Sequence, residues 1–156
     1  VAGPVAPLRP ANGPENDQSN LTTAFVALLQ QVPANKLILA IPLYGYSWQT
    51  TEPRLFAPTY PGTGRLAMRK DFLNTLAGLP SVSYRWDEAS RTPFTTRPDL
   101  RKNQPVFTVV SYDDERSIQE KMEFASDLQL GGVAFWALGY AEESDPLWSA
   151  IHSFAP

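Results

Sequence analysis

The chain has no cysteine and only one histidine, His152, among its 156 residues. Disulfide bonds and thiolate metal sites are therefore excluded, and a lone histidine excludes a histidine-rich metal site. Positive charge is also scarce, because 13 lysines and arginines stand against 16 acidic residues and the net charge is −3. No basic stripe is present to neutralise phosphate groups, so nucleic acid is not expected as a partner.

Long apolar runs are missing as well. A membrane-spanning helix needs about 20 consecutive apolar residues, and no window of the sequence approaches that length, so no membrane partner is expected. The composition that remains, 43% hydrophobic and 12% aromatic, is that of a globular chain with enough residues for one core. We expect neither a cofactor nor a metal.

Residues 35–48, NKLILAIPLYGYSW, join an uncharged run to a cluster of aromatic residues. A buried strand is predicted over Lys36–Leu43. A loop over Val1–Asn20, rich in proline and glycine at its start, and a helix over Asn20–Gln31 precede this strand. Asn20 is a suitable N-cap for that helix. The order helix, short connection, strand is typical of a layered α/β fold.

Residues 49–103 differ in kind because they are rich in turn residues. They contain a helical stretch over Leu66–Leu79 and an alternating run that places Tyr84 and Trp86 on one face of a strand. A hairpin turn is predicted over Asp87–Arg91. We interpret this zone as a small α+β insertion whose core contains Tyr84 and Trp86.

The remaining sequence predicts a second helix–strand unit. A strand over Val106–Tyr112 leads into an amphipathic helix, and the acids at 113–115 are interpreted as helix-capping residues. A short buried strand over Val133–Leu138 and a closing helix follow. Two buried strands, each preceded by a helix, indicate consecutive units of a parallel sheet, which needs further strands for stability. We therefore expect the chain to be the end of a larger fold.

Two segments carry a family resemblance. KLILAIPLYGYSW resembles the seventh barrel strand of glycoside hydrolase family 18, the chitinase family. VSYDDERSIQEKMEFASDLQLGGVAFWALGY is similar to the last helix and eighth strand of that family, a strand that ends in Trp-x-Leu. The residues between them stand where many members carry an α+β insertion beside the substrate groove. The resemblance covers the chain from about Pro4 to Phe154.

This resemblance implies an α/β fold, the C-terminal portion of a (β/α)8 TIM barrel. Residues 1–48 would supply a loop, a helix and strand 7, residues 49–105 the α+β insertion, and residues 106–156 the last helices and strand 8. The family hydrolyses β-1,4 links of N-acetylglucosamine polymers such as chitin with retention. A glutamic acid protonates the leaving oxygen, while the acetamido oxygen of the substrate attacks the anomeric carbon.

The resemblance also implies substrate-binding roles for four aromatic residues. TIM-barrel active sites lie at the carboxyl ends of the strands. Strand 7 would bring Tyr44, Tyr46 and Trp48 there, and strand 8 would bring Trp136. Sugar rings present apolar C–H faces that stack on such rings. Packing is the alternative for each: barrel packing for Tyr44, surface or insertion packing for Tyr46 and Trp48, and strand core for Trp136.

The chain also departs from the family pattern. The fourth-strand signature Asp-x-x-Asp-x-Asp-x-Glu and the sixth-strand Met-x-Tyr-Asp are absent. No catalytic residue is therefore assigned, and the catalytic acid is expected upstream of this chain. Tyr46 stands where many chitinases have an arginine, which removes a positive hydrogen-bond donor from the groove.

Three functional classes stay open: a chitinase-like glycosidase, a relative that acts on the glycan of peptidoglycan, and a non-catalytic carbohydrate-binding protein. The tyrosine in place of arginine favours the second class slightly over the first. The expected partners are a polysaccharide containing N-acetylglucosamine and either the missing N-terminal half of the barrel or a second copy of the chain. A secreted or cell-envelope location is expected, and the chain alone is expected to hydrolyse nothing.

Overall fold

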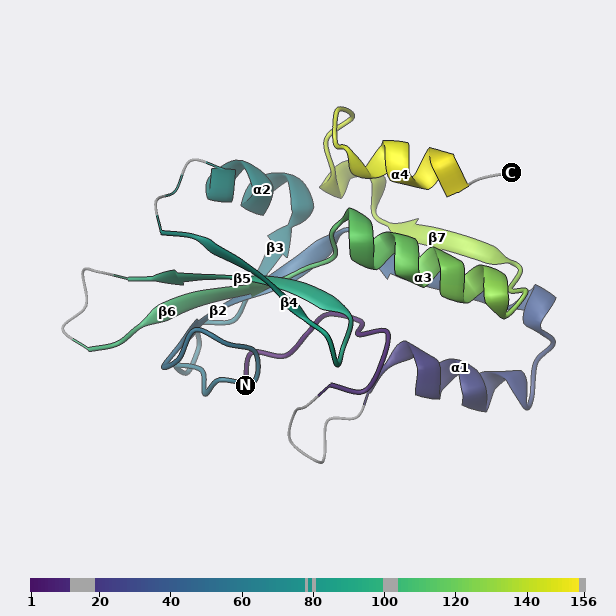
Figure 1. Cartoon of the computed structure of the whole chain (residues 1–156), viewed down its shortest axis with the longest axis horizontal. Coiled ribbons are helices and arrows are strands. Elements are labelled where there is room, and N and C mark those ends of the chain that lie inside the picture. The colour runs from purple at the N-terminus through teal and green to yellow at the C-terminus, as the bar shows by residue number, and fades with distance from the viewer. Residues whose placement is uncertain (12–18, 78, 80, 100–103, 155–156) are drawn as a thin grey trace.

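The computed structural model describes residues 1–11, 19–77, 79, 81–99 and 104–154. Two sheets organise these residues (Figure 1). In the smaller sheet, β1 (Ile38–Pro42) runs parallel to β7 (Gly132–Trp136). The two buried strands predicted at Lys36–Leu43 and Val133–Leu138 are therefore neighbours and parallel, which confirms the prediction.

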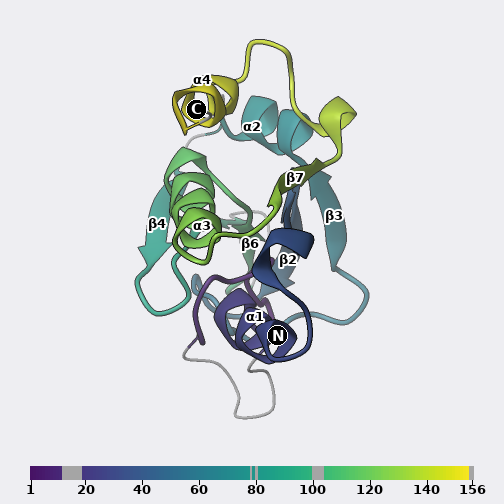
Figure 2. The ribbon, with the colours of Figure 1, turned by 90° about the vertical axis from the view of Figure 1, so that its right-hand side faces the viewer.

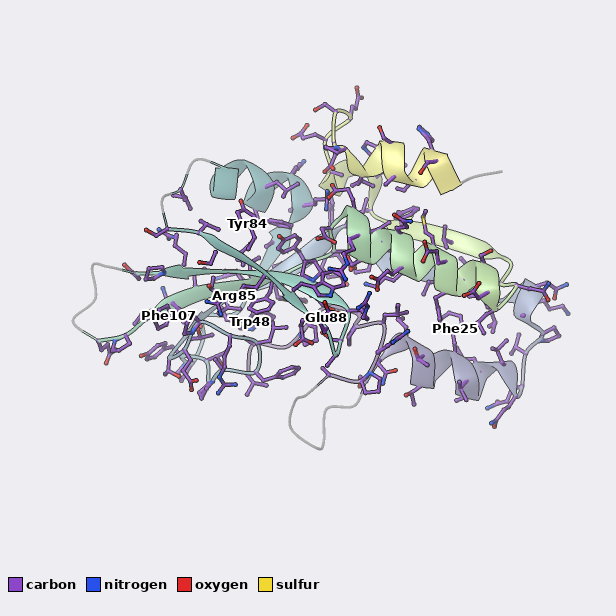
Figure 3. All side chains as sticks on the ribbon, viewed as in Figure 1. Phe25, Trp48, Tyr84, Arg85, Glu88 and Phe107 are labelled. Carbon is purple, nitrogen blue, oxygen red and sulfur yellow. The ribbon has the colours of Figure 1, made fainter. Side chains whose placement is uncertain are left out.

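Three helices cover one face of this strand pair: α1 (Leu21–Leu29), α3 (Glu115–Asp127) and α4 (Leu147–Phe154). Figure 2 shows α4, α3 and α1 following one another along one side of the strands. Phe25 reaches from α1 toward α3 (Figure 3), where its ring meets that of Phe124 with 5.8 Å between centroids. The buried core of this layer consists of Phe25, Leu39, Ile41, Leu43, Ile118, Met122, Ala125 and Leu147.

The opposite face of the strand pair is open. Side chains alternate between the two faces of a strand, and the buried Leu39 and Ile41 of β1 alternate with exposed neighbours. Ala134 and Trp136 of β7 are exposed in the same way; the register places Ala134 beside the exposed Ala40 and Trp136 beside Pro42, which is buried. We call this surface the uncovered face, and it comprises Ile38, Ala40, Ala134 and Trp136.

The larger sheet is antiparallel, with the strand order β3-β2-β6-β5-β4. Its central strands, β2 (Tyr44–Thr50) and β6 (Phe107–Ser111), pair with each other. The insertion expected from the sequence spans 49–105, whereas this sheet takes strands from 44 to 111. The remaining elements of this zone are β3 (Arg65–Met68), α2 (Arg69–Ala77), β4 (Ser83–Asp87) and β5 (Thr92–Pro98).

Two expectations for this zone need correction. The helix predicted over Leu66–Leu79 begins only at the first residue of α2, because the preceding residues pair with β2 as β3; Gly78 lies outside the described residues. The hairpin of β4 and β5 forms as predicted, but Tyr84 is 63% exposed and does not belong to a core. Trp86 is half-buried, with the guanidinium of Arg116 at 3.7 Å from its ring centroid.

The sequence predicted the start of α1 correctly but placed the end of the last strand too late. The Asn20 side chain accepts a hydrogen bond from the backbone N–H of Thr23 at 2.9 Å, which confirms the predicted cap of α1. Leu138 was expected in the last strand, but it begins a short 3-10 helix, η2 (Leu138–Tyr140); another, η1 (Ala34–Lys36), precedes β1.

Residues 12–18 of the predicted first loop lie outside the described part of the chain. Among the residues described, no helix combines the length and apolarity needed to cross a membrane.

Gly45 permits a close approach between the two central strands of the larger sheet. A Cβ atom on this residue would lie 2.1 Å from the carbonyl oxygen of Ser111, which is backbone and cannot rotate away. Gly45 is also buried. The sequence of β2 therefore needs a residue without a side chain between its first two tyrosines.

We expect Gly45→Ala to lower the free energy of unfolding by about 1–3 kcal/mol, because overpacking forces the backbone of β2 away from β6. Urea unfolding of the purified chain measures this loss. Gly139→Ala is the matched control, since a Cβ atom at Gly139 meets nothing within 4 Å. Equal stability of the two variants would contradict the close approach.

Candidate functional site

An aromatic surface lies along β2, directly after the carboxyl end of β1. Tyr44, Tyr46 and Trp48 occupy alternate positions, so their side chains leave the same face of the strand. The rings of Tyr44 and Tyr46 meet edge to face with centroids 6.1 Å apart. Those of Tyr46 and Trp48 are stacked, with centroids 5.8 Å apart and an angle of 28° between the planes.

Tyr140 extends this surface from a distant part of the sequence. It ends η2, just beyond β7, and its ring meets that of Tyr44 with 6.4 Å between centroids. We call Tyr44, Tyr46, Trp48 and Tyr140 the aromatic row. Its members thus come from the residues that follow β1 and from those that follow β7.

Exposure differs along the aromatic row. Tyr46 is exposed, whereas Tyr44, Trp48 and Tyr140 are half-buried. Trp48 also packs against a small buried cluster that includes Leu55, and in Figure 3 it lies on the opposite side of the sheet from Tyr84. Trp48 therefore combines a packing role with partial exposure, and Tyr46 is the most exposed member of the row.

Trp136 stands at the carboxyl end of β7. It is 67% exposed, and its backbone carbonyl accepts a hydrogen bond from the Leu43 N–H at 2.7 Å. The register sets it beside Pro42, two residues before the aromatic row begins. A tryptophan held by its backbone while its indole is open to solvent can stack on a flat, partly apolar ligand.

Sequence reasoning did not single out two residues near this surface. Tyr140 follows Trp136 by four positions and could have been found by extending the aromatic cluster to the end of the second motif. Arg69 gives no local signal, yet it is buried, and it binds Asp145 through Nε at 2.6 Å and through Nη2 at 2.8 Å. Burial alone would lower the pKa of Arg69, but the hydrogen bonds and charges of Asp145 and Glu115 outweigh it and raise that pKa.

The acids at 113–115 have three different roles, so capping explains only one of them. Asp114 caps α3: its carboxylate accepts the Ser117 N–H at 2.8 Å, and the Ser117 hydroxyl accepts the Asp114 N–H. Burial raises the pKa of Asp114, although the hydrogen bonds from Ser117 act in the opposite direction. Asp113 instead pairs with Lys121 at 2.6 Å, and Glu115 pairs with Arg69 at 2.5 Å. All three acids therefore have structural roles, but only Asp114 caps the helix.

The exposed groups of this region are aromatic rather than ionisable. Within the described residues, no group of three or more histidine and acidic side chains could hold a metal ion. The exposed groups that converge near the ends of β1 and β7 are aromatic rings, which interact with apolar faces of a ligand and with cations. The buried charges beside them are paired.

Comparison with known proteins decides the family. The sequence model of glycosyl hydrolases family 18 matches residues 1–141. The chain belongs to this family. The cortical fragment-lytic enzyme of Bacillus subtilis is 32% identical over 111 residues, which cover 71% of this chain and 24% of that enzyme. The family 18 chain thus spans about a quarter of this curated relative.

Solved structures agree with the fold. The Group IV chitinase of Ostrinia furnacalis has a TM-score of 0.77 at 23% identity, over 99% of this chain and 46% of that one. Human YKL-39, described as a pseudo-chitinase with retained chitooligosaccharide binding properties, gives 0.77 at 21% identity, over 99% and 45%. The mixed α/β arrangement of this chain is therefore that of about half of a family 18 structure.

The pair Lys121–Asp113 offers a test of how much the structure depends on buried charge near the site. Both side chains are at most 1% exposed. We expect Lys121→Met to lower the free energy of unfolding by about 3–5 kcal/mol, because Asp113 is left as an uncompensated buried charge. Urea unfolding measures the loss, and adding Asp113→Asn should restore part of it.

Lys36→Met is the control, because Lys36 is exposed and a surface substitution typically changes stability by about 0.5 kcal/mol or less. A Lys121→Met variant as stable as this control would show that the pair does not bear on stability.

Proposed function

We propose that the chain is the C-terminal portion of a family 18 (β/α)8 barrel, with β1 and β7 as its seventh and eighth strands. The parallel pairing of β1 and β7, the helix layer on one face and the uncovered apolar face on the other support this assignment. In a closed barrel the uncovered face points inward, where side chains from the other strands fill the interior. The five-stranded sheet, with strands from 44 to 111, forms the insertion between the two barrel strands.

The ligand is a polysaccharide containing N-acetylglucosamine, bound by aromatic stacking. The observation that carries this proposal is the position of the exposed Trp136 and of the aromatic row at the carboxyl ends of β1 and β7, the end of a barrel where active sites lie. Trp136 forms the floor beneath the sugar at the cleavage point, and Tyr44 and Tyr46 line the wall that the insertion contributes. Trp48 supports Tyr46 by stacking against it.

The reaction is hydrolysis of β-1,4 links with retention, in which the substrate acetamido group acts as the nucleophile. The residues of this chain bind and orient the sugar, and the general acid comes from the fourth strand of the complete barrel, whose signature this chain lacks. The acids near the aromatic row fit this division of labour, since Asp113, Asp145 and Glu115 are engaged with Lys121 and Arg69.

Chitin is the first substrate candidate, and the glycan of peptidoglycan is the alternative. Tyr46 occupies the place of an arginine found in many chitinases, and one of the relatives with 32% identity is a cortical fragment-lytic enzyme. Analysis of sugar products from the complete protein on both polymers decides between them. A secreted or cell-envelope location suits either substrate, because both polymers lie outside the cytoplasm.

A substitution of Trp136 tests the stacking role. In the complete protein, we expect Trp136→Ala to weaken binding of N-acetylglucosamine oligomers by about ten- to a hundredfold, since one aromatic stacking surface is worth about 1–3 kcal/mol by analogy with base stacking. Isothermal titration measures the affinity, and initial rates on the same oligomers measure turnover.

Tyr84→Ala is the matched control, because Tyr84 is exposed to a similar degree but lies on the opposite side of the insertion sheet from Trp48. Unchanged affinity of a well-folded Trp136→Ala protein would return Trp136 to a packing role.

The chain by itself is expected to hydrolyse neither chitin oligomers nor peptidoglycan, because a general acid must lie within hydrogen-bond reach of the glycosidic oxygen. Product formation is assayed for the purified chain alone and after mixing with the upstream half of the barrel. Turnover only in the mixture is the expected result. Turnover by the chain alone would place the acid among these residues and overturn the assignment of strands.

A further inference from the structure

Arg69 joins its own segment to three others, two of them through its buried side chain and one through its backbone N–H. Its Nη1 donates to the carbonyl oxygen of Asp113 at 2.6 Å, and its Nη2 contacts Glu115 at 2.5 Å, both at the start of α3. Its Nε and Nη2 hold the two carboxylate oxygens of Asp145, just before α4. Its backbone N–H donates to the carbonyl of Leu43, which separates β1 from β2.

These contacts lie close in sequence to both segments that carry the aromatic row. Leu43 immediately precedes Tyr44, the first residue of the row on β2. Asp145 follows Tyr140 by five residues and ends the connection that leads from β7 to α4. Arg69 therefore ties the two segments that must meet for the rings of Tyr44 and Tyr140 to touch.

The connection from β7 to α4 is held by the packing of Tyr140 and Ala141 against the helix-covered core, by the Trp148 Nε1–H bond to the Glu142 carbonyl and by the side chain of Asp145. Its backbone hydrogen bonds described here are local, as from Tyr140 N–H to the carbonyl of Ala137 at 2.8 Å and from Asp145 N–H to that of Glu142 at 3.1 Å. The carboxylate of Asp145 links it both to Arg69 and to α4, since Oδ1 also accepts the Leu147 N–H at 3.0 Å. A planar guanidinium that bonds a carboxylate with two parallel hydrogen bonds fixes orientation as well as distance, which an ammonium group does not.

We propose that Arg69 is a positioning residue for carbohydrate binding. Through Asp145 and Leu43 it sets the relative placement of Tyr140 and Tyr44, and so the shape of the surface on which the sugar stacks. The carbohydrate part of this inference rests on the proposed function. The placement of the two rings does not, because the contacts alone specify it.

A second ion-paired arginine supplies a matched control. Arg91, in the turn between β4 and β5, also joins the larger sheet to α3: its Nε donates to Glu120 at 2.7 Å. Its Nη1 donates to Glu88 at 2.5 Å in the same turn, and its guanidinium lies 5.3 Å from the ring centroid of Trp86 on β4. Arg91→Lys thus weakens a connection of the same chemical kind without affecting a contact of Leu43 or Asp145, the residues beside the two segments of the aromatic row.

The experiment compares Arg69→Lys, Asp145→Asn and Arg91→Lys in the complete protein. Two readouts are used: the nuclear Overhauser contact between the rings of Tyr44 and Tyr140, and the affinity for the N-acetylglucosamine tetramer measured by titration. Asp145→Asn retains an oxygen acceptor for the Leu147 N–H, so it keeps the start of α4 intact while removing the charge that faces Arg69.

We expect Arg69→Lys to lose the ring contact and to bind the tetramer about tenfold more weakly, with Asp145→Asn changed in the same direction and Arg91→Lys unchanged in both readouts. Retention of the ring contact in folded Arg69→Lys and Asp145→Asn would overturn the positioning role. So would an equal loss of the contact in Arg91→Lys. Failure of the unsubstituted complete protein to bind the tetramer would instead overturn the proposed function, while the ring contact would still decide what Arg69 does.

Discussion

One continuous segment, residues 38–50, belongs to both sheets, and the two cores are built around it. Its first part pairs with β7, and its second part pairs with β6 and β3. Because side chains alternate along a strand, Leu39 and Ile41 enter the helix-covered core, while Tyr44 and Tyr46 leave from one face farther along. A slip of one residue in the register would move these side chains to the opposite faces of their sheets. The pairing register therefore fixes the helix-covered core and the aromatic row together.

Elements with local signals were predictable from the sequence. Asn20 caps α1, the turn after β4 forms, and the apolar spacing that includes Ile118 and Met122 marks the buried face of α3. The parallel neighbours β1 and β7 were also predicted, because two uncharged strands, each preceded by a helix, admit few arrangements. The family motif then pointed to Trp136, whose exposure no periodicity would predict for a residue of a buried strand.

Features that depend on distant residues were not predictable. The sequence around Leu66 predicts a helix, but the residues before α2 pair with β2 and form β3. Asp113 sits at a helix start and looks like a cap, yet Lys121 lies eight positions along the chain and takes both of its oxygens. Arg69 finds its carboxylate 76 positions away. Such pairings follow from tertiary packing, which overrides local preference.

The order in which the chain leaves the ribosome delays some of these strand pairings. Within this chain β2 meets its first partner strand at Arg65, but β6 and β7 begin only at Phe107 and Gly132, and the N–H of Val5 donates to the hydroxyl of Ser111, 106 positions later. Pairing over such distances is slow because loop closure precedes any gain from contact. Within this chain β1 therefore lacks its partner β7 until Gly132–Trp136 has emerged, and we expect the nascent chain to depend on chaperones that shield the apolar strand until then.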